Sequence, residues 1–162
     1  MLVRKMTVDD VAAVSEIEKA CFSLPWSAKS FEDSITREDT IFLVCEVDAE
    51  ETCDIEGMSD TEASKCSCIA GYIGMYLSFD EASVTNVAVS PEFRKKGCGV
   101  ALVSAAKEAA KQAGAEMIFL EVRVSNESAI SLYRKKGFED IGIRKNFYEH
   151  PVEDAIIMKV GI

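Results

Sequence analysis

The segment from Val84 to Val103 constrains the fold more than any other part of the chain. It begins with a β-branched apolar run that ends at Val89, is interrupted at Pro91, and becomes alanine-rich after Gly97 and Gly99. This order predicts a strand, a loop and a helix. Two glycines at the start of a helix leave its backbone uncovered. Consecutive N–H groups and the positive end of the helix dipole can then bind an anion such as phosphate or pyrophosphate.

The glycine spacing differs from that of two widespread phosphate-binding loops. A Walker loop requires Gly, four residues and then Gly-Lys-Ser/Thr, and a dinucleotide-binding turn requires three glycines directly after its strand. The segment from Arg94 to Gly99 reads Arg-Lys-Lys-Gly-Cys-Gly and fits neither pattern. Taken alone, this segment is also compatible with a basic turn that leads into a helix starting at glycine and binds no ligand.

Length and composition predict one soluble domain. The chain has 162 residues, of which 48% are hydrophobic, and a chain of this size buries about two thirds of its unfolded surface. No apolar run approaches the roughly 18 residues of a membrane helix. The segment from Met1 to Met6 lacks the apolar core of a signal peptide. We therefore expect a single domain over residues 1–162, located in the cytoplasm and without a membrane partner.

Charge and cysteine usage narrow the classes of partner. The net charge of -10 argues against nucleic acid, whose phosphates most of the surface would repel, but it suits a basic protein substrate. The six cysteines include no Cys-x-x-Cys pair, so neither a disulfide framework nor a zinc finger is expected. Cys53 with Cys66 and Cys68 is the one cluster worth weighing as a metal site, and we expect no metal.

The remaining pattern alternates helices with strands, which predicts a mixed α/β fold. Apolar spacings of three and four predict the helices, and β-branched or continuous apolar runs predict the strands. The second and third strands should form an antiparallel hairpin, and the fourth should be buried on both faces because its run is almost wholly apolar. The predicted helices are Thr7 to Cys21, Ser27 to Thr36, Val100 to Ala113 and Asn126 to Lys136, and the predicted strands are Thr40 to Val47, Cys68 to Leu77, Glu81 to Val89, Glu116 to Val124, Phe138 to Phe147 and Asp154 to Val160.

An acidic segment at residues 48–67 interrupts this pattern. It contains few large apolar residues and shows neither helical nor strand periodicity. We expect a flexible insertion here. An acidic lip that attracts a basic substrate is the alternative interpretation.

Two residues stand out as candidates for proton transfer. Glu121 lies inside the apolar run Ile-Phe-Leu-Glu-Val, where a carboxylate needs either a partner or a role such as general base. An ion pair with Arg123, on the same face of the strand, or with a neighbouring basic group is an equally good interpretation. Tyr133 lies on the apolar side of its predicted helix, where an aromatic residue is usually core. Its hydroxyl could also donate a proton to a leaving thiolate.

Several stretches of the chain resemble the GNAT acetyltransferase superfamily, and within it the RimI-type ribosomal-protein N-terminal acetyltransferases. They occur in the same order and with compatible spacing over most of the chain. The stretches are Pro25 to Ser27 with Phe31, the loop Arg94 to Gly99 after Asn-Val-Ala-Val, Leu120 to Asn126, Ala129 to Tyr133, Gly137 with Phe138, Arg144 to Tyr148, and Glu153 to Met158.

The resemblance implies a GNAT fold, with a mostly antiparallel central sheet flanked by helices. It also implies transfer of acetyl from acetyl-CoA to the α-amine of a protein N-terminus. In the bacterial members of the group, this acceptor is the terminal alanine of a small-subunit ribosomal protein. The protein is expected to act as a monomer or weak dimer. The acidic segment at 48–67 and the Phe147-Tyr148 pair, where the group often has two tyrosines, are departures that bear on substrate choice.

The resemblance also assigns roles to individual residues. Glu121 would be the general base, through water, and Tyr133 the acid that protonates the departing sulfur. Because the amine attacks directly, no cysteine, serine or histidine nucleophile is required. A transferase for a small amine or a lysine side chain stays open, as does a non-catalytic acyl-CoA-binding module. The residues implied to contact the cofactor are Val87, Ala88, Val89, Arg94, Lys95, Lys96, Gly97, Cys98, Gly99, Val100 and Asn126.

Overall fold

The computed structural model describes residues 1–48 and 67–162. Within these ranges, seven strands form one sheet in the order β1-β2-β3-β4-β5-β7-β6. All neighbouring pairs are antiparallel except β4 and β5. The strands are β1 (Leu2–Lys5), β2 (Thr40–Asp48), β3 (Ser67–Ser78), β4 (Glu81–Val89), β5 (Met117–Arg123), β6 (Glu139–Glu149) and β7 (Val152–Gly161).

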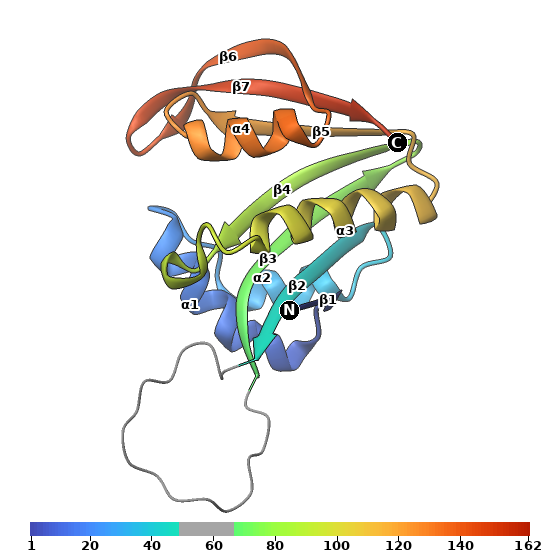
Figure 1. The fold of residues 1–162 in the computed structure, drawn as a ribbon, viewed down its shortest axis with the longest axis vertical. Coiled ribbons are helices and arrows are strands. Elements are labelled where there is room, and N and C mark those ends of the chain that lie inside the picture. Colours follow the sequence, from blue (N-terminus) through green and yellow to red (C-terminus); the bar gives the residue numbers. More distant parts are fainter. Residues whose placement is uncertain (49–66) are drawn as a thin grey trace, which may run out of the picture.

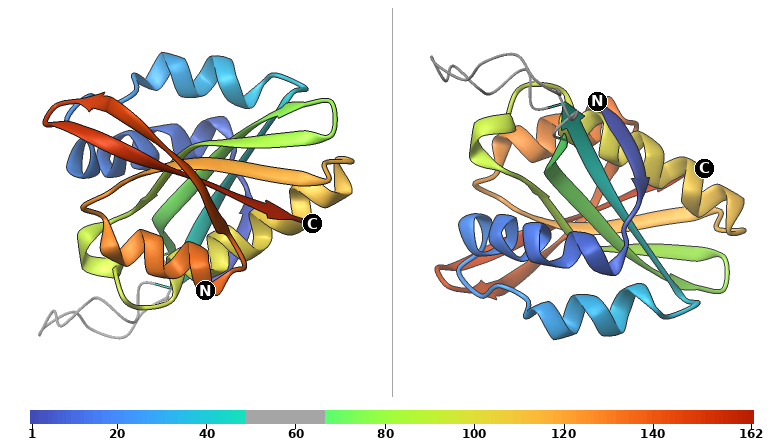
Figure 2. Two further views of the ribbon diagram at one scale, coloured as in Figure 1. Left: turned by 90° about the horizontal axis from the view of Figure 1, so that it is seen from above. Right: turned by 90° about the horizontal axis from the view of Figure 1, so that it is seen from below.

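Helices cover both faces of the sheet, which confirms the expected mixed α/β architecture. Figure 2 shows α1 and α2 on one face and α3 and α4 on the other. Short 3-10 turns precede α1 and α3. The helical segments are η1 (Val8–Asp10), α1 (Val11–Cys21), α2 (Ala28–Ile35), η3 (Pro91–Phe93), α3 (Cys98–Gln112) and α4 (Glu127–Lys135).

The predicted ends of several helices are confirmed. Ser27 accepts a hydrogen bond from the backbone N–H of Ser30 at 3.1 Å, and therefore caps the start of α2. Gly114 and Gly137 follow α3 and α4 with φ angles of 89° and 88°. That left-handed geometry ends a helix most easily at glycine.

Two expectations about strands were wrong. No strand was expected at Leu2–Lys5, yet this segment pairs with β2 at the edge of the sheet. The strand β5 was expected to be buried on both faces, but its side chains alternate between buried and half-buried. One face of β5 packs into the core, whereas the other is partly open to solvent. The insertion predicted at residues 48–67 lies outside the described residues, apart from Asp48 and Ser67 at the ends of β2 and β3.

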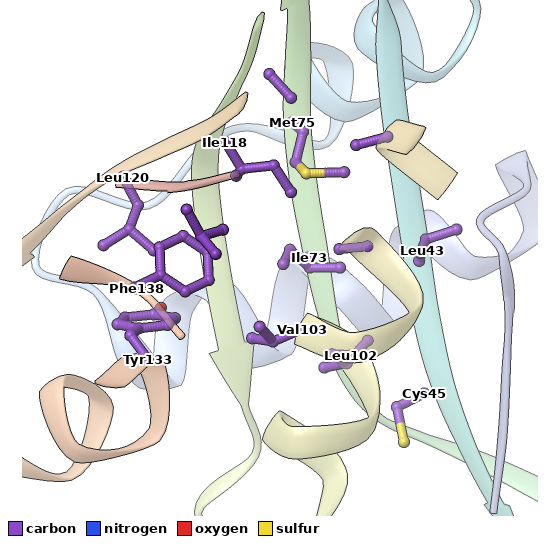
Figure 3. Close-up of a cluster of buried hydrophobic side chains, with 14 of the residues drawn as sticks. Leu43, Cys45, Ile73, Met75, Leu102, Val103, Ile118, Leu120, Tyr133 and Phe138 are labelled. Carbon is purple, nitrogen blue, oxygen red and sulfur yellow. The ribbon is translucent and has the colours of Figure 1, made fainter. Parts of the chain in front are cut away.

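The sheet separates two apolar cores. On the α3 side, Leu102 and Val103 pack against residues of the central strands such as Ile73 and Ile118 (Figure 3). On the α1 and α2 side, a smaller cluster includes the fully buried side chain of Phe31. Strands β2, β3 and β4 contribute side chains to both cores, whereas β5 contributes only to the larger one.

The smaller core contains a buried carboxylate. Glu18 of α1 is 1% exposed, and it accepts hydrogen bonds from the Tyr72 hydroxyl, from Asn86 Nδ2 at 3.3 Å and from the backbone N–H of Trp26 at 3.1 Å. Burial, and secondarily the bond to Glu18, raises the pKa of Tyr72 well above its usual range. Glu18 thereby ties α1 and the α1–α2 turn to the central strands β3 and β4.

Candidate active site

The strands β4 and β5 run parallel but are hydrogen-bonded only over a short stretch. The pairing joins residues 81–83 to residues 117–119. Figure 1 shows β4 and β5 diverging toward the end of β4 that leads into η3. Residues 87–89 pair with β3 along one edge. Among the described residues, no strand pairs with their other edge, which leaves backbone groups there for a ligand, apart from the Val89 carbonyl, which accepts from Arg94.

A bulge in β4 lies at the start of this separation. Gly74 of β3 is opposite Asn86, whereas the next residue, Met75, is opposite Val84. Thr85 therefore has no opposite residue. Because a bulge bends its strand and increases the local twist, this position directs the end of β4 away from β5.

The N-terminus of α3 has the geometry of an anion site. Gly97 precedes the helix with a φ angle of 92°, which glycine adopts without steric cost. The backbone N–H of Ala101 makes a helical hydrogen bond to the Gly97 carbonyl at 3.0 Å. The N–H groups of residues 98–100 have no acceptor within the helix, and they lie at the positive end of its dipole. The predicted order of strand, loop and helix is confirmed.

In the loop from Arg94 to Gly99, most side chains are exposed to solvent, but one is buried in the protein. Lys95 and Lys96 are exposed and carry positive charge at the helix start. Arg94 donates from Nε to the Val89 carbonyl at 3.2 Å, which links the loop to the end of β4. Cys98 is only 1% exposed and packs beside Cys45. Cys98 therefore offers a ligand its backbone N–H and not its thiol. Burial is the main cause that raises the pKa of Cys45 to about 12.

Gly99 allows α3 and α4 to approach each other. A Cβ atom at Gly99 would lie 3.1 Å from Cδ1 of Leu132 in α4. Leu132 directly precedes Tyr133, so the close approach holds the candidate acid near the start of α3. Asn126 caps α4, because its Oδ1 accepts the backbone N–H of Ala129 at 3.2 Å. Within residues 1–48 and 67–162, its side-chain amide N–H groups make no hydrogen bond.

Glu121 lies on the open face of β5. Its neighbours Leu120 and Val122 are buried on the other face. The Glu121 side chain is 29% exposed, and its Oε1 lies 3.1 Å from Nη1 of Arg144 in β6. The ion pair expected as the alternative interpretation is therefore present, but with a neighbouring basic group, Arg144, and not with Arg123.

Arg123 is instead committed to the turn between β6 and β7. It lies 3.0 Å from Glu153 and donates to the carbonyls of His150 at 3.1 Å and Pro151 at 3.2 Å. Its guanidinium also lies 4.0 Å from the centre of the Tyr148 ring. Arg123 therefore fixes the β6–β7 turn next to Glu121.

Tyr133 is buried in the larger core. It is 8% exposed, and its ring centre lies 5.6 Å from that of Phe138. Figure 3 shows the two rings next to each other. Burial, and to a smaller extent the neighbouring Tyr148, raises the pKa of Tyr133 well above its usual range. Within the described part of the chain, its hydroxyl makes no hydrogen bond. The phenol is protonated at neutral pH, as an exposed tyrosine also is, and burial makes it a weaker proton donor.

Sequence reasoning missed the part that Tyr148 plays in this site. Its hydroxyl donates to the backbone carbonyl of Glu121 at 3.3 Å. Burial raises the pKa of Tyr148, and the nearby Arg123 opposes that shift. Tyr148 influences the titration of Tyr133 and is itself influenced by Glu121. Tyr148 is therefore close to both candidate catalytic residues, and no local sequence pattern indicates its contact with Glu121.

Two turns meet at the edge of the site. Ser23, in the α1–α2 turn, donates from Oγ to the His150 carbonyl in the β6–β7 turn at 2.7 Å. Both turns expose apolar side chains next to this contact: Phe22 and Leu24 in the first, and Val152 in the second. The two turns therefore border the site together, and they expose apolar side chains there.

Residues 1–48 and 67–162 contain no group of three or more His, Cys, Asp and Glu side chains arranged to hold a metal ion. In the same part of the chain, no helix has the length and apolar character needed to cross a membrane. An open hollow beside α4, lined by Ile130, Ser131 and Arg134 among others, includes neither Glu121 nor Tyr133.

The chain is similar in sequence to known acetyltransferases. The sequence profile of the Acetyltransferase (GNAT) family matches residues 11–138. A Bacillus subtilis protein named "Putative ribosomal protein bS18-alanine N-acetyltransferase" is 37% identical over 161 residues, which cover 99% of this chain and 95% of the relative. The ribosomal protein bS18-alanine N-acetyltransferase of Escherichia coli K12 is 30% identical over 162 residues, covering 99% and 97% of the two chains.

Solved structures share the fold. The crystal structure of the ribosomal-protein-S18-alanine N-acetyltransferase from Escherichia coli superposes with a TM-score of 0.78 at 29% identity, covering 99% of this chain and 93% of that one. Arabidopsis thaliana NAA60 in complex with acetyl-CoA superposes with a TM-score of 0.81, covering 99% of each chain. At 15% identity, this second likeness concerns the fold alone.

Proposed function

Because the chain belongs to the GNAT acetyltransferase family and is an N-acetyltransferase, we propose that it transfers acetyl from acetyl-CoA to the α-amine of a protein N-terminus. The proposed acceptor is the N-terminal alanine of a small-subunit ribosomal protein. The names of the Bacillus subtilis and Escherichia coli relatives, which align over nearly their full lengths, support this choice. The net charge of -10 favours a basic acceptor.

The single observation that carries the proposal is the divergence of β4 and β5 beside the N-terminus of α3. The free backbone edge of residues 87–89 suits the amide groups of a pantetheine arm. The N–H groups of residues 98–100, with Lys95 and Lys96, suit a pyrophosphate. Acetyl-CoA contains both parts, and when bound it supplies an acetyl group already activated as a thioester.

Two side chains would manage the protons in this reaction. The acceptor amine must lose a proton to attack, and Glu121 on the open face of β5 would take that proton through water. The departing CoA sulfur must gain a proton. Tyr133, whose phenol is protonated at neutral pH, would supply it as the thiolate leaves. Positioning of the amine against the thioester would provide most of the remaining acceleration.

We further propose that residues 1–162 act as one domain in the cytoplasm, as a monomer or weak dimer. The family match over residues 11–138 and the near-complete coverage of both relatives support a single domain.

A peptide panel tests the proposed function. Acetyl-CoA and the protein are incubated with a peptide that begins Ala-Arg and contains an internal lysine, and with the same peptide carrying a blocked N-terminus. We expect acetylation at the free α-amine and none on the blocked peptide, with sites read by mass spectrometry. Labelling confined to lysine side chains would instead indicate a lysine acetyltransferase, and binding of acetyl-CoA without any transfer would indicate a non-catalytic module.

A further inference from the structure

The contact between Glu121 and Arg144 poses a chemical problem for the proposed base. A carboxylate whose oxygen is engaged by a guanidinium is hindered in accepting a proton or in binding the acceptor amine. The Oε1 of Glu121 and Nη1 of Arg144 lie 3.1 Å apart. An acceptor N-terminus is also a cation at neutral pH, because its amine has a pKa of about 8. The guanidinium and the incoming ammonium therefore compete for one carboxylate.

The competing guanidinium comes from a strand that is not adjacent to β5. Arg123 is the cation nearest to Glu121 along β5, but it is held by Glu153 and by two carbonyls of the β6–β7 turn. Arg144 belongs to β6, which is separated from β5 by β7. Its opposite residue on β7 is the small, fully buried Ala155. The Arg144 side chain therefore reaches Glu121 across β7.

Arg144 has both the exposure and the local backbone needed to move. Its side chain is 53% exposed, and its guanidinium also lies 5.1 Å from the centre of the Phe147 ring. Regular pairing of β6 with β7 breaks off after Arg144 and resumes at Tyr148. Within the break, Asn146 has a φ angle of 51°, and its N–H donates to Asp154. Arg144 is thus the last regularly paired residue before an irregular segment.

We propose that Arg144 is a competing counter-ion that occupies the acceptor-amine position at Glu121 and is displaced when the peptide N-terminus binds. This inference rests on the proposed function. Displacement requires that the ion pair be weak, and a partly exposed pair satisfies that requirement because solvent screens it. The same guanidinium already contacts the Phe147 ring, and this contact can persist when the ion pair is broken. Arg144 therefore raises the KM for the acceptor without taking part in the proton transfer.

Kinetics of Arg144→Gln test the proposal. The neutral side chain no longer competes for Glu121, so we expect the KM for the Ala-Arg peptide to fall about two- to fivefold with kcat nearly unchanged, the range that corresponds to a partly exposed ion pair. Arg144→Lys retains a cation and should stay closer to the unaltered protein. Lys145→Gln, which removes the adjacent exposed charge of β6, is the matched control for net charge and should leave the KM unchanged.

A second readout separates competition from a structural effect. The acetylated product peptide has no α-ammonium, so its inhibition constant should be the same for Arg144→Gln and the unaltered protein. A KM that is unchanged or increased in Arg144→Gln, or an equal change in the product inhibition constant, would overturn the counter-ion role alone. Absence of α-amine acetylation by the unaltered protein would overturn the proposed function and this inference together.

Discussion

Glu121→Gln is expected to lower kcat for the Ala-Arg peptide by about 10²- to 10⁴-fold, the usual contribution of a general base. Glutamine has nearly the same shape as glutamate, and its carbonyl oxygen can still accept from Arg144. It cannot take up the proton that the acceptor amine releases. The measurement is the steady-state rate from pH 6 to 9 with saturating acetyl-CoA.

The control for this substitution is Glu139→Gln, which makes the same chemical change at an exposed position of β6. It should leave the rate unchanged. Coenzyme A affinity should also be the same in Glu121→Gln, because the carboxylate lies on β5 and not at the start of α3. A Glu121→Gln rate within twofold of the unaltered protein across the whole pH range would show that the general-base role is wrong.

Glu18→Ala is expected to lower the free energy of unfolding by about 3 kcal/mol. The substitution leaves the Tyr72 hydroxyl, the Asn86 amide and the backbone N–H of Trp26 without their acceptor. It also opens space in the smaller core, because Glu18 is among the fully buried side chains. Urea unfolding followed by circular dichroism measures the loss.

Two variants on α1 calibrate this result. Glu18→Gln keeps the volume and one carbonyl acceptor, so it should lose clearly less stability than Glu18→Ala. Glu16→Ala removes a carboxylate whose side chain is 73% exposed and should stay within about 0.5 kcal/mol of the unaltered protein. If Glu18→Ala were no less stable than Glu16→Ala, the buried network would not tie the α1–α2 turn to the central strands.

The parts of the fold that sequence could predict are those with a local cause. Ser27 and Asn126 precede apolar helical stripes and cap α2 and α4 as expected. Gly97 stands where the chain needs a positive φ angle before α3. In each case the pattern and the structure that it determines lie within a few residues of one another.

The short strand β1 could not be predicted, because its stability comes from distant partners. Four residues are too few to display a strand period. The segment is held by its pairing with β2 and by Arg4, which forms ion pairs with Asp10 at 2.8 Å and with Glu46 at 2.6 Å. Only the assembled sheet brings Glu46 next to Arg4.

The candidate site was predictable in its residues but not in its contacts. Glu121 is conspicuous as a carboxylate in an apolar run, yet its partner Arg144 comes from a strand that is not adjacent to β5. The thiol of Cys98 is directed into the core, although the residue lies in the predicted anion loop. Tyr148 contacts the Glu121 carbonyl only because β6 pairs with β7, which in turn pairs with β5. Such contacts depend on strand order, which no local pattern records.

Calorimetric titration of coenzyme A into Gly97→Asp and Gly97→Asn tests most directly whether the start of α3 holds the cofactor diphosphate. A Cβ atom at Gly97 would meet no other atom within 4 Å, so both side chains fit, and both carry the same backbone strain at a φ angle of 92°. They have nearly the same size but differ in charge and in the N–H donors of the amide. We expect Gly97→Asp to bind coenzyme A at least about tenfold more weakly than Gly97→Asn, since a carboxylate beside the diphosphate adds repulsion at close range. Equal affinities for the two variants would contradict a diphosphate at this helix.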